Sequence, residues 1–173
     1  YREISSKDMS ASNGSASSLW GVIYSMSYVV SFIYEELPNI DIPESDFNEI
    51  TAAASFLRAY AYLVGAYTYG GIPIVTTTNV EENRDIPRAT LDETLEFIES
   101  ELLYALDKLP EESFNAGEAT NGAVKALLAR YYLFRGNWTE AEKYATDVIE
   151  GNGTKTYTLE EEFVDAVSDF STE

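Results

Sequence analysis

The sequence contains no cysteine and no histidine among its 173 residues. The missing thiol excludes disulfides and cysteine nucleophiles. The missing imidazole excludes Ser-His-Asp triads, and it removes the histidine ligands on which many zinc sites depend. Without cysteine, the sequence also gives no indication of the redox state of its compartment. We therefore expect no catalytic residues, no metal site and no cofactor.

Basic residues are scarce as well. The 11 Lys and Arg stand against 30 Asp and Glu, which gives a formal net charge of -19. Such a surface repels phosphate backbones and anionic lipid headgroups, so nucleic acid is not expected as a partner. A neutral ligand, a cation or a basic protein surface is compatible with this charge, and the simplest interpretation of the acids is that they solvate the surface.

Adjacent acids raise the alternative of a hydrolase with two catalytic carboxylates. They occur at residues 35–36, 81–82, 111–112 and 160–162. Glycoside hydrolysis needs one acid in an apolar pocket, with a raised pKa, that faces a second acid. These acids fall at expected helix ends or in loops, where water solvates them. The sequence therefore favours a protein without enzymatic activity, and an assay for released reducing sugar tests this.

A long uncharged stretch at residues 9–34 raises the question of a membrane span. The polar run at 10–15 and the later serines Ser25, Ser27 and Ser31 predict an apolar part that is too short to cross a bilayer. The chain begins at Tyr1 without a basic and apolar leader, so we expect any targeting segment to be absent from this sequence.

Apolar residues recur three or four positions apart through most of the chain, which predicts helices. We expect one domain over 1–173, with an N-terminal loop at 1–18, helices over 19–150 and an irregular tail at 151–173. The first three helices are expected at 19–37, 46–69 and 90–109, with a polar loop at 76–88. A fourth helix carries inward-facing residues from Val124 to Phe134, and a fifth runs from Trp138 to Ile149.

Local signals refine this interpretation. Gly70 and Gly71, followed by Pro73, end the second helix, and Thr90 with Glu93 forms a capping box at the start of the third. Ala52, Ala59 and Ala66 form a small-residue face that permits close helix approach. We expect Arg58 to pair with a nearby carboxylate and Trp138 to lie in the core.

The strongest repeat signal lies near the end of the predicted helical region. Its spacing resembles the tetratricopeptide pattern, in which small residues lie where two helices touch; the residues are Leu128, Ala129, Tyr132, Gly136, Trp138, Ala141 and Ala145. Together with five helices joined by turns, it predicts an all-α fold of antiparallel helical hairpins stacked as a tetratricopeptide-like α-solenoid. Spacing alone leaves a plain helical bundle as a competitor.

Four blocks of sequence, in order, resemble the SusD/RagB family of outer-membrane nutrient-binding lipoproteins. The first contains FLRAY at 56–60 and YGGIPIV at 69–75, which are similar to the family signature. The others are PRAT at 87–90 with the leucine-striped helix after it, residues 119–130, and residues 136–149 with YTL at 157–159. Together they cover nearly the whole of residues 19–163, but the second half of the family fold is absent from this sequence.

The resemblance implies a SusD-like fold and a cell-surface protein without catalytic activity. Such a protein would be lipid-anchored and surface-exposed at the cell outer membrane. It would bind an oligosaccharide, or a peptide, and deliver it to a SusC-type TonB-dependent transporter. Independently of the family, loop position and side-chain chemistry suggest Asn79, Asn83 and Arg84 as ligand contacts, because amides and guanidinium groups match sugar hydroxyls. The alternative is a tetratricopeptide-type protein–protein interaction scaffold, with a concave groove lined by Asn, Lys and Arg.

Overall fold

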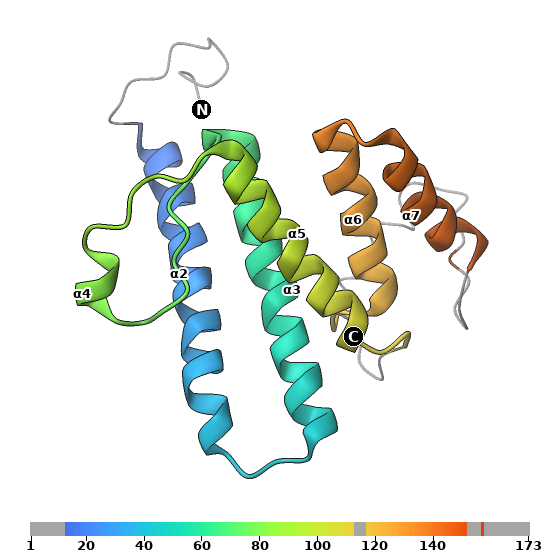
Figure 1. The fold of residues 1–173 in the computed structure, drawn as a ribbon, viewed down its shortest axis with the longest axis horizontal. Helices are drawn as coiled ribbons and strands as arrows, with labels where there is room; N and C mark the ends of the chain where they lie inside the picture. The colour runs from blue at the N-terminus through green and yellow to red at the C-terminus, as the bar shows by residue number, and fades with distance from the viewer. Residues whose placement is uncertain (1–12, 113–116, 152–156, 158–173) are drawn as a thin grey trace.

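A computed structural model describes residues 13–112, 117–151 and 157 of the chain. Every regular element among these residues is helical: α2 (Gly14–Glu36), the 3₁₀ turn η1 (Leu37–Asn39), α3 (Glu44–Tyr69), α4 (Val80–Asn83), α5 (Leu91–Lys108), α6 (Asn121–Arg135) and α7 (Trp138–Glu150). The long helices α2, α3, α5, α6 and α7 pack side by side in chain order, each antiparallel to the one before (Figure 1). The predicted all-α arrangement of stacked hairpins is confirmed.

Helix α2 begins earlier than the sequence pattern predicts. The segment up to residue 18 was expected to be a loop, but the helix starts at Gly14. Asn13 explains the difference, because its side chain accepts hydrogen bonds from the backbone amides of Ser15 and Ala16, each at 3.1 Å. Polar residues that favour loops are also the residues that cap helix N-termini. Residues 1–12 of the expected loop lie outside the described residues.

The prediction that this segment is too short for a membrane span was wrong in its length argument. Residues Gly14–Asn39 form a stretch that is long and apolar enough to cross a bilayer, with a mean hydropathy of 1.3 over an 18-residue window. One side of this helix packs in the core, although only 22% of its apolar window is buried. Ser27 and Ser31 are fully buried, and Ile23 packs against α3 at Gly65, where an added Cβ would lie 3.3 Å from the Ile23 Cδ1 atom.

Small residues bring the first helices together. Ala52, Ala59 and Ala66 on α3 are almost completely buried, as the sequence predicted. Helix α3 begins at Glu44, two residues before its expected start, and ends at Tyr69 as expected. Helix α5 carries the predicted capping box, in which Thr90 accepts from the Glu93 amide and the Glu93 carboxylate accepts from the Thr90 amide.

Helices α6 and α7 form the last hairpin, and Gly136 turns between them with a φ of 77°. Two predictions for this hairpin were wrong. Trp138 was expected in the core, but it is 67% exposed at the first position of α7. Phe134 was expected to face inward and is 43% exposed, with its ring edge-to-face against Tyr67 at 4.2 Å. Among the described residues, no further hairpin stacks beyond α7 to cover Trp138.

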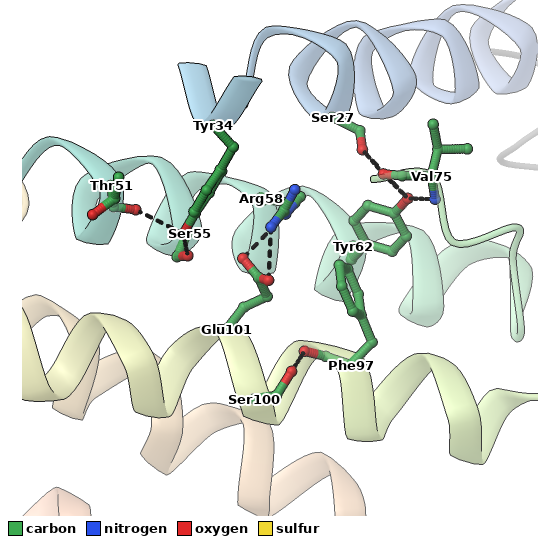
Figure 2. Close-up of polar contacts among 10 residues, drawn as sticks. All are labelled: Ser27, Tyr34, Thr51, Ser55, Arg58, Tyr62, Val75, Phe97, Ser100 and Glu101. Carbon is green, nitrogen blue, oxygen red and sulfur yellow. Dashed lines mark hydrogen bonds and ion pairs between the residues drawn. The ribbon is translucent and has the colours of Figure 1, made fainter. Parts of the chain in front are cut away.

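A buried ion pair joins α3 to α5. Arg58 donates from Nε and a terminal nitrogen to the two carboxylate oxygens of Glu101, at 3.1 and 2.8 Å (Figure 2). The guanidinium group also contacts the rings of Tyr34, at 5.1 Å, and Phe97, at 5.5 Å. Since a buried charge requires a matched partner, this pair fixes how α3 lies on α5. The expected carboxylate partner of Arg58 is confirmed as Glu101.

Candidate functional site

The loop between α3 and α5 begins with a segment held tightly against the core. Tyr62 accepts a hydrogen bond from the Val75 amide at 2.8 Å, and the Ser27 hydroxyl donates to the Val75 carbonyl at 2.6 Å (Figure 2). The Tyr24 hydroxyl donates to the Pro73 carbonyl at 3.0 Å. Burial raises the pKa of the Tyr62 hydroxyl, so it stays protonated and available to the loop backbone. Side chains from α2 and α3 therefore supply the hydrogen bonds that an extended segment cannot make within itself.

Two glycines set the direction in which this segment leaves α3. Gly70 ends the helix with a φ of 74°, a conformation that side chains disfavour. Gly71 lies so close to the start of α5 that an added Cβ would come within 2.1 Å of the Ala89 carbonyl oxygen. The two ends of this loop, at Gly71 and Ala89, therefore lie side by side, so the whole loop projects from one point between α3 and α5.

The next part of the loop is fastened to α2 by one carboxylate. Glu35 accepts hydrogen bonds from the Thr78 amide at 2.8 Å, from the Thr77 hydroxyl at 3.0 Å and from the Thr78 hydroxyl. The bonds from Thr78 to the ionised form are the main reason why the pKa of Glu35 lies below its ordinary value. Glu35 thus acts as the clamp that holds the outer part of the loop against the end of α2.

The outer part of the loop was predicted to be irregular, but it contains the short helix α4, which stands out from the stacked helices beside α2 (Figure 1). Asn79 caps this helix: its side-chain oxygen accepts from the Glu81 amide at 3.0 Å and its nitrogen donates to Glu82 at 2.6 Å. The Asn83 side chain donates to the Thr77 carbonyl at 2.8 Å. Asn79 therefore uses both its side-chain oxygen and its nitrogen inside the loop, whereas Asn83 uses its nitrogen, and the buried Asn83 side-chain oxygen has no hydrogen-bond partner among the described residues.

Arg84 is an exposed residue on this turn. Its side chain is 64% exposed and bonds to the equally open Glu81 at 3.0 Å. An exposed pair of this kind contributes little to stability, so the guanidinium group can exchange Glu81 for another acceptor at small cost. The structure thus brings Asn79, Asn83 and Arg84 together on one short turn, with two of them shaping it and one facing outward.

Sequence reasoning missed the residues that hold this loop. Glu35 was considered only as one of a pair of acids, and Tyr62 and Ser27 only as helix residues. A polar residue on the apolar stripe of a helix, such as Ser27, was the available signal, because a buried hydroxyl needs a partner. The partner itself, Val75, lies 48 positions away and could not be chosen from spacing.

The site shows no arrangement suited to acid–base or metal chemistry. Among the residues that the structure describes, no group of three or more Asp and Glu side chains is placed to hold a metal ion. The loop acids Glu81 and Glu82 lie in the first turn of α4, where both are exposed to water. What the geometry offers is hydrogen-bond donors and acceptors on a rigid support, which suits binding.

Known proteins of one family resemble this chain in sequence. Residues 2–133 match the family model for SusD-like proteins, described as starch-binding and associating with the outer membrane. The chain belongs to the SusD-like family. A SusD-like protein P2 from Formosa agariphila is 27% identical over 164 residues, which cover 94% of this chain and 32% of that protein.

Solved structures of SusD-like proteins have the same helical arrangement. A SusD-like protein from Bacteroides fragilis superposes with a TM-score of 0.78 at 28% identity, over 86% of this chain and 30% of that one. A structure solved with a xylogluco-oligosaccharide gives a TM-score of 0.76 at 26% identity, over 87% of this chain and 32% of the other. The chain thus spans about a third of the length of each of these three proteins.

Proposed function

We propose that this protein binds oligosaccharides at the cell surface without altering them chemically and passes them to a SusC-type TonB-dependent transporter. The observation that carries the proposal is the family match over residues 2–133, since the family is described as starch-binding and outer-membrane-associated. A structural relative crystallised with a xylogluco-oligosaccharide supports a glycan as the ligand class. Lipid anchoring and exposure at the outer membrane are part of the same proposal.

Within this chain, the loop that carries α4 is the proposed ligand contact. Arg84 would donate to sugar hydroxyls, while Asn79 and Asn83 would keep the turn in shape for it. The support for this assignment is structural: the loop is fixed at Tyr62 and at Glu35, so binding does not have to order it. A pre-formed loop is the condition under which a few hydrogen bonds give useful affinity.

Isothermal titration tests the proposal, with the protein at the length at which its host makes it. A panel of starch-, laminarin- and xyloglucan-derived oligosaccharides is titrated, and at least one is expected to bind. Arg84→Ala is expected to weaken that binding about tenfold, the loss of one charge-assisted hydrogen bond of roughly 1.5 kcal/mol. Lys143→Ala is the matched control, because Lys143 also forms an exposed ion pair three residues from its partner.

The remaining parts of the proposal have separate tests. Reducing-sugar release from the bound glycan should stay at background, whereas measurable release would indicate a hydrolase. Affinity purification from the host's outer membrane should recover a TonB-dependent transporter. Recovery of a cytosolic chaperone or enzyme instead would favour the tetratricopeptide-type scaffold.

A further inference from the structure

A groove lies on the face of α3 away from the ligand loop, between α3 and the start of α6. Its volume is about 680 Å³, and Leu109 at the end of α5 closes one side of it. This volume falls within the range of pockets that hold peptides and small ligands. The groove is separate from Asn79, Asn83 and Arg84, none of which lines it.

The floor of the groove is apolar. Ile50 and Leu57 lie two helical turns apart on one face of α3 and are 41% and 42% exposed. Between them lie the side chains of Ala53 and Phe56, and Ala123 faces them from α6. Half-exposed large aliphatic residues on a common helix face form a surface that gains free energy when another apolar group covers it.

All the ionisable side chains that line the groove are acidic. They are Asp46 and Glu49 on α3 and Glu118 just before α6, and all three are exposed. Among the residues that the structure describes, no lysine or arginine lines the groove. The net charge of -19 extends this negative field over the whole molecule, which accelerates the approach of a cationic partner.

We propose that this groove docks a basic, amphipathic segment of a partner protein, with Leu, Ile or Phe side chains on the Ile50–Leu57 floor and Lys or Arg against Asp46 and Glu49. A sugar fits it poorly, because none of the described lining residues carries a side-chain amide or a hydroxyl, and the apolar floor offers sugar hydroxyls no partner. An anionic lipid or nucleic acid is repelled by the three carboxylates. The inference does not rest on glycan binding.

The test uses the protein at the length at which its host makes it and a labelled peptide of Leu, Ala and Lys designed as an amphipathic helix. Binding is followed by fluorescence anisotropy at increasing salt. The Lys peptide is expected to bind, and its affinity should fall as salt screens the carboxylates. A peptide with Glu in place of Lys, and one with Ser in place of Leu, should each bind at least tenfold more weakly.

Variants of the protein assign the binding to the groove. Asp46→Lys combined with Glu49→Lys should lower the affinity for the Lys peptide at least tenfold. Glu96→Lys combined with Glu142→Lys is the control: it makes the same charge change at exposed helix positions outside the groove. Leu57→Asp should also weaken binding although it adds negative charge, because it removes the apolar floor. Circular dichroism and melting temperature should match the parent protein for all three.

Three results would overturn the proposal. One is no binding of the Lys peptide to the protein at its natural length, which would mean that its own chain or another group already covers the groove. Another is an equal loss of affinity in the control pair, which would assign the effect to net charge. The third is unchanged binding in both the Asp46→Lys/Glu49→Lys and Leu57→Asp variants.

Discussion

At the scale of single residues, Arg58 stands out because its charged side chain is buried, unlike the other Lys, Arg, Asp and Glu residues that the structure describes. Its side chain is 7% exposed, Glu101 is 12% exposed, and the two groups share a bidentate ion pair between α3 and α5. The rings of Tyr34 and Phe97 lie against the guanidinium group, which limits water access to the charge. Removing one member of such a pair leaves the other charged and desolvated, which costs more than the pair contributes when it is intact.

We therefore expect Arg58→Met to lower the free energy of unfolding by roughly 3–5 kcal/mol, because Glu101 is left without a partner. Arg58→Met combined with Glu101→Leu should recover most of this loss, since a well-packed apolar pair needs no compensation. Urea unfolding followed by circular dichroism measures both variants. A double variant as unstable as the single one would contradict this account of the ion pair.

Gly71 allows a second prediction, because the backbone at Ala89 leaves no room for a side chain. Gly-to-Ala changes within helices usually stabilise a protein by ~0.5–1 kcal/mol. Gly71→Ala should instead destabilise this protein, and by more than that amount. Gly21→Ala is the control, because an added Cβ there meets nothing within 4 Å, and it should be stabilising. Thermal unfolding of the two variants should therefore shift in opposite directions. A shift in the same direction would show that the Gly71 contact is relieved by movement of the loop.

Single residues also show what sequence reasoning can and cannot supply. That Arg58 would pair was predictable, because arginine on an apolar helix face needs a carboxylate. Its partner was not, because Glu101 lies 43 positions away on another helix, among many acids. Trp138 was placed in the core from a repeat pattern that assumes a further hairpin, and its 67% exposure follows from the absence of one among the described helices.

At the scale of secondary-structure elements, the residues at which helices begin and end were harder to predict than the presence of the helices. Helix α2 was expected at residue 19 and begins at Gly14, since the same polar residues can form a loop or cap a helix. Short helix α4 was missed because four residues carry no periodicity. The capping box at Thr90 was found because its two members are fixed three residues apart.

The link between Glu35 and the α4 loop gives a prediction about pH. The pKa of Glu35 is lower in the folded state than its ordinary value of 4.5. The stabilisation that ionised Glu35 gives to the folded state is therefore complete above pH 4.5 and is lost as the pH falls through the lower folded pKa. In acid, the bonds to Thr77 and Thr78 should therefore weaken, and amide exchange at Thr78 should accelerate relative to the core of α3. NMR exchange measurements at several pH values check this.

Glu35→Gln is the matched variant for this measurement. It keeps the shape of the side chain but removes the charge, so Thr78 should exchange faster already at neutral pH and lose most of the acid dependence. Persistence of the full acid dependence in this variant would assign the effect to another carboxylate. Glu93, whose pKa is also lowered by its capping bonds to Thr90, is the first to examine in that case.

At the scale of the whole molecule, the stacked hairpins were predictable from periodicity, whereas their surfaces were not. Helical stripes identify which residues face a neighbour, and consecutive helices in a chain tend to pack beside each other in antiparallel order. Which outer faces stay open depends on what else packs there. The three- and four-residue spacing correctly places Ile23 and Val30 of α2 on the buried face, but it gives no reason why Val22, Val29 and Phe32 are apolar while each is more than half exposed.

The ligand loop and the apolar groove occupy different parts of this stack, because α4 stands beside α2 while the groove lies between α3 and α6. Hydrogen bonds link neighbouring helices of the stack: Tyr131 and Tyr132 of α6 both donate to Glu99 of α5, at 3.0 and 2.6 Å. The two surfaces are thus held at fixed separation by a packed interior. Sequence reasoning suggested the loop and had no means of finding the groove, whose walls come together only in three dimensions.

The two tryptophans lie in different surroundings, so intrinsic fluorescence can distinguish the two ends of the helical stack. Trp20 lies half-buried between Tyr24 and Tyr69, with ring centroids at 5.0 and 5.2 Å, close to the anchored start of the loop. Trp138 projects into water from the last hairpin. Their emission maxima should therefore differ, with Trp138 at the longer wavelength. With Trp138 replaced by Phe, fluorescence would report from the end that carries the loop alone, without an added label.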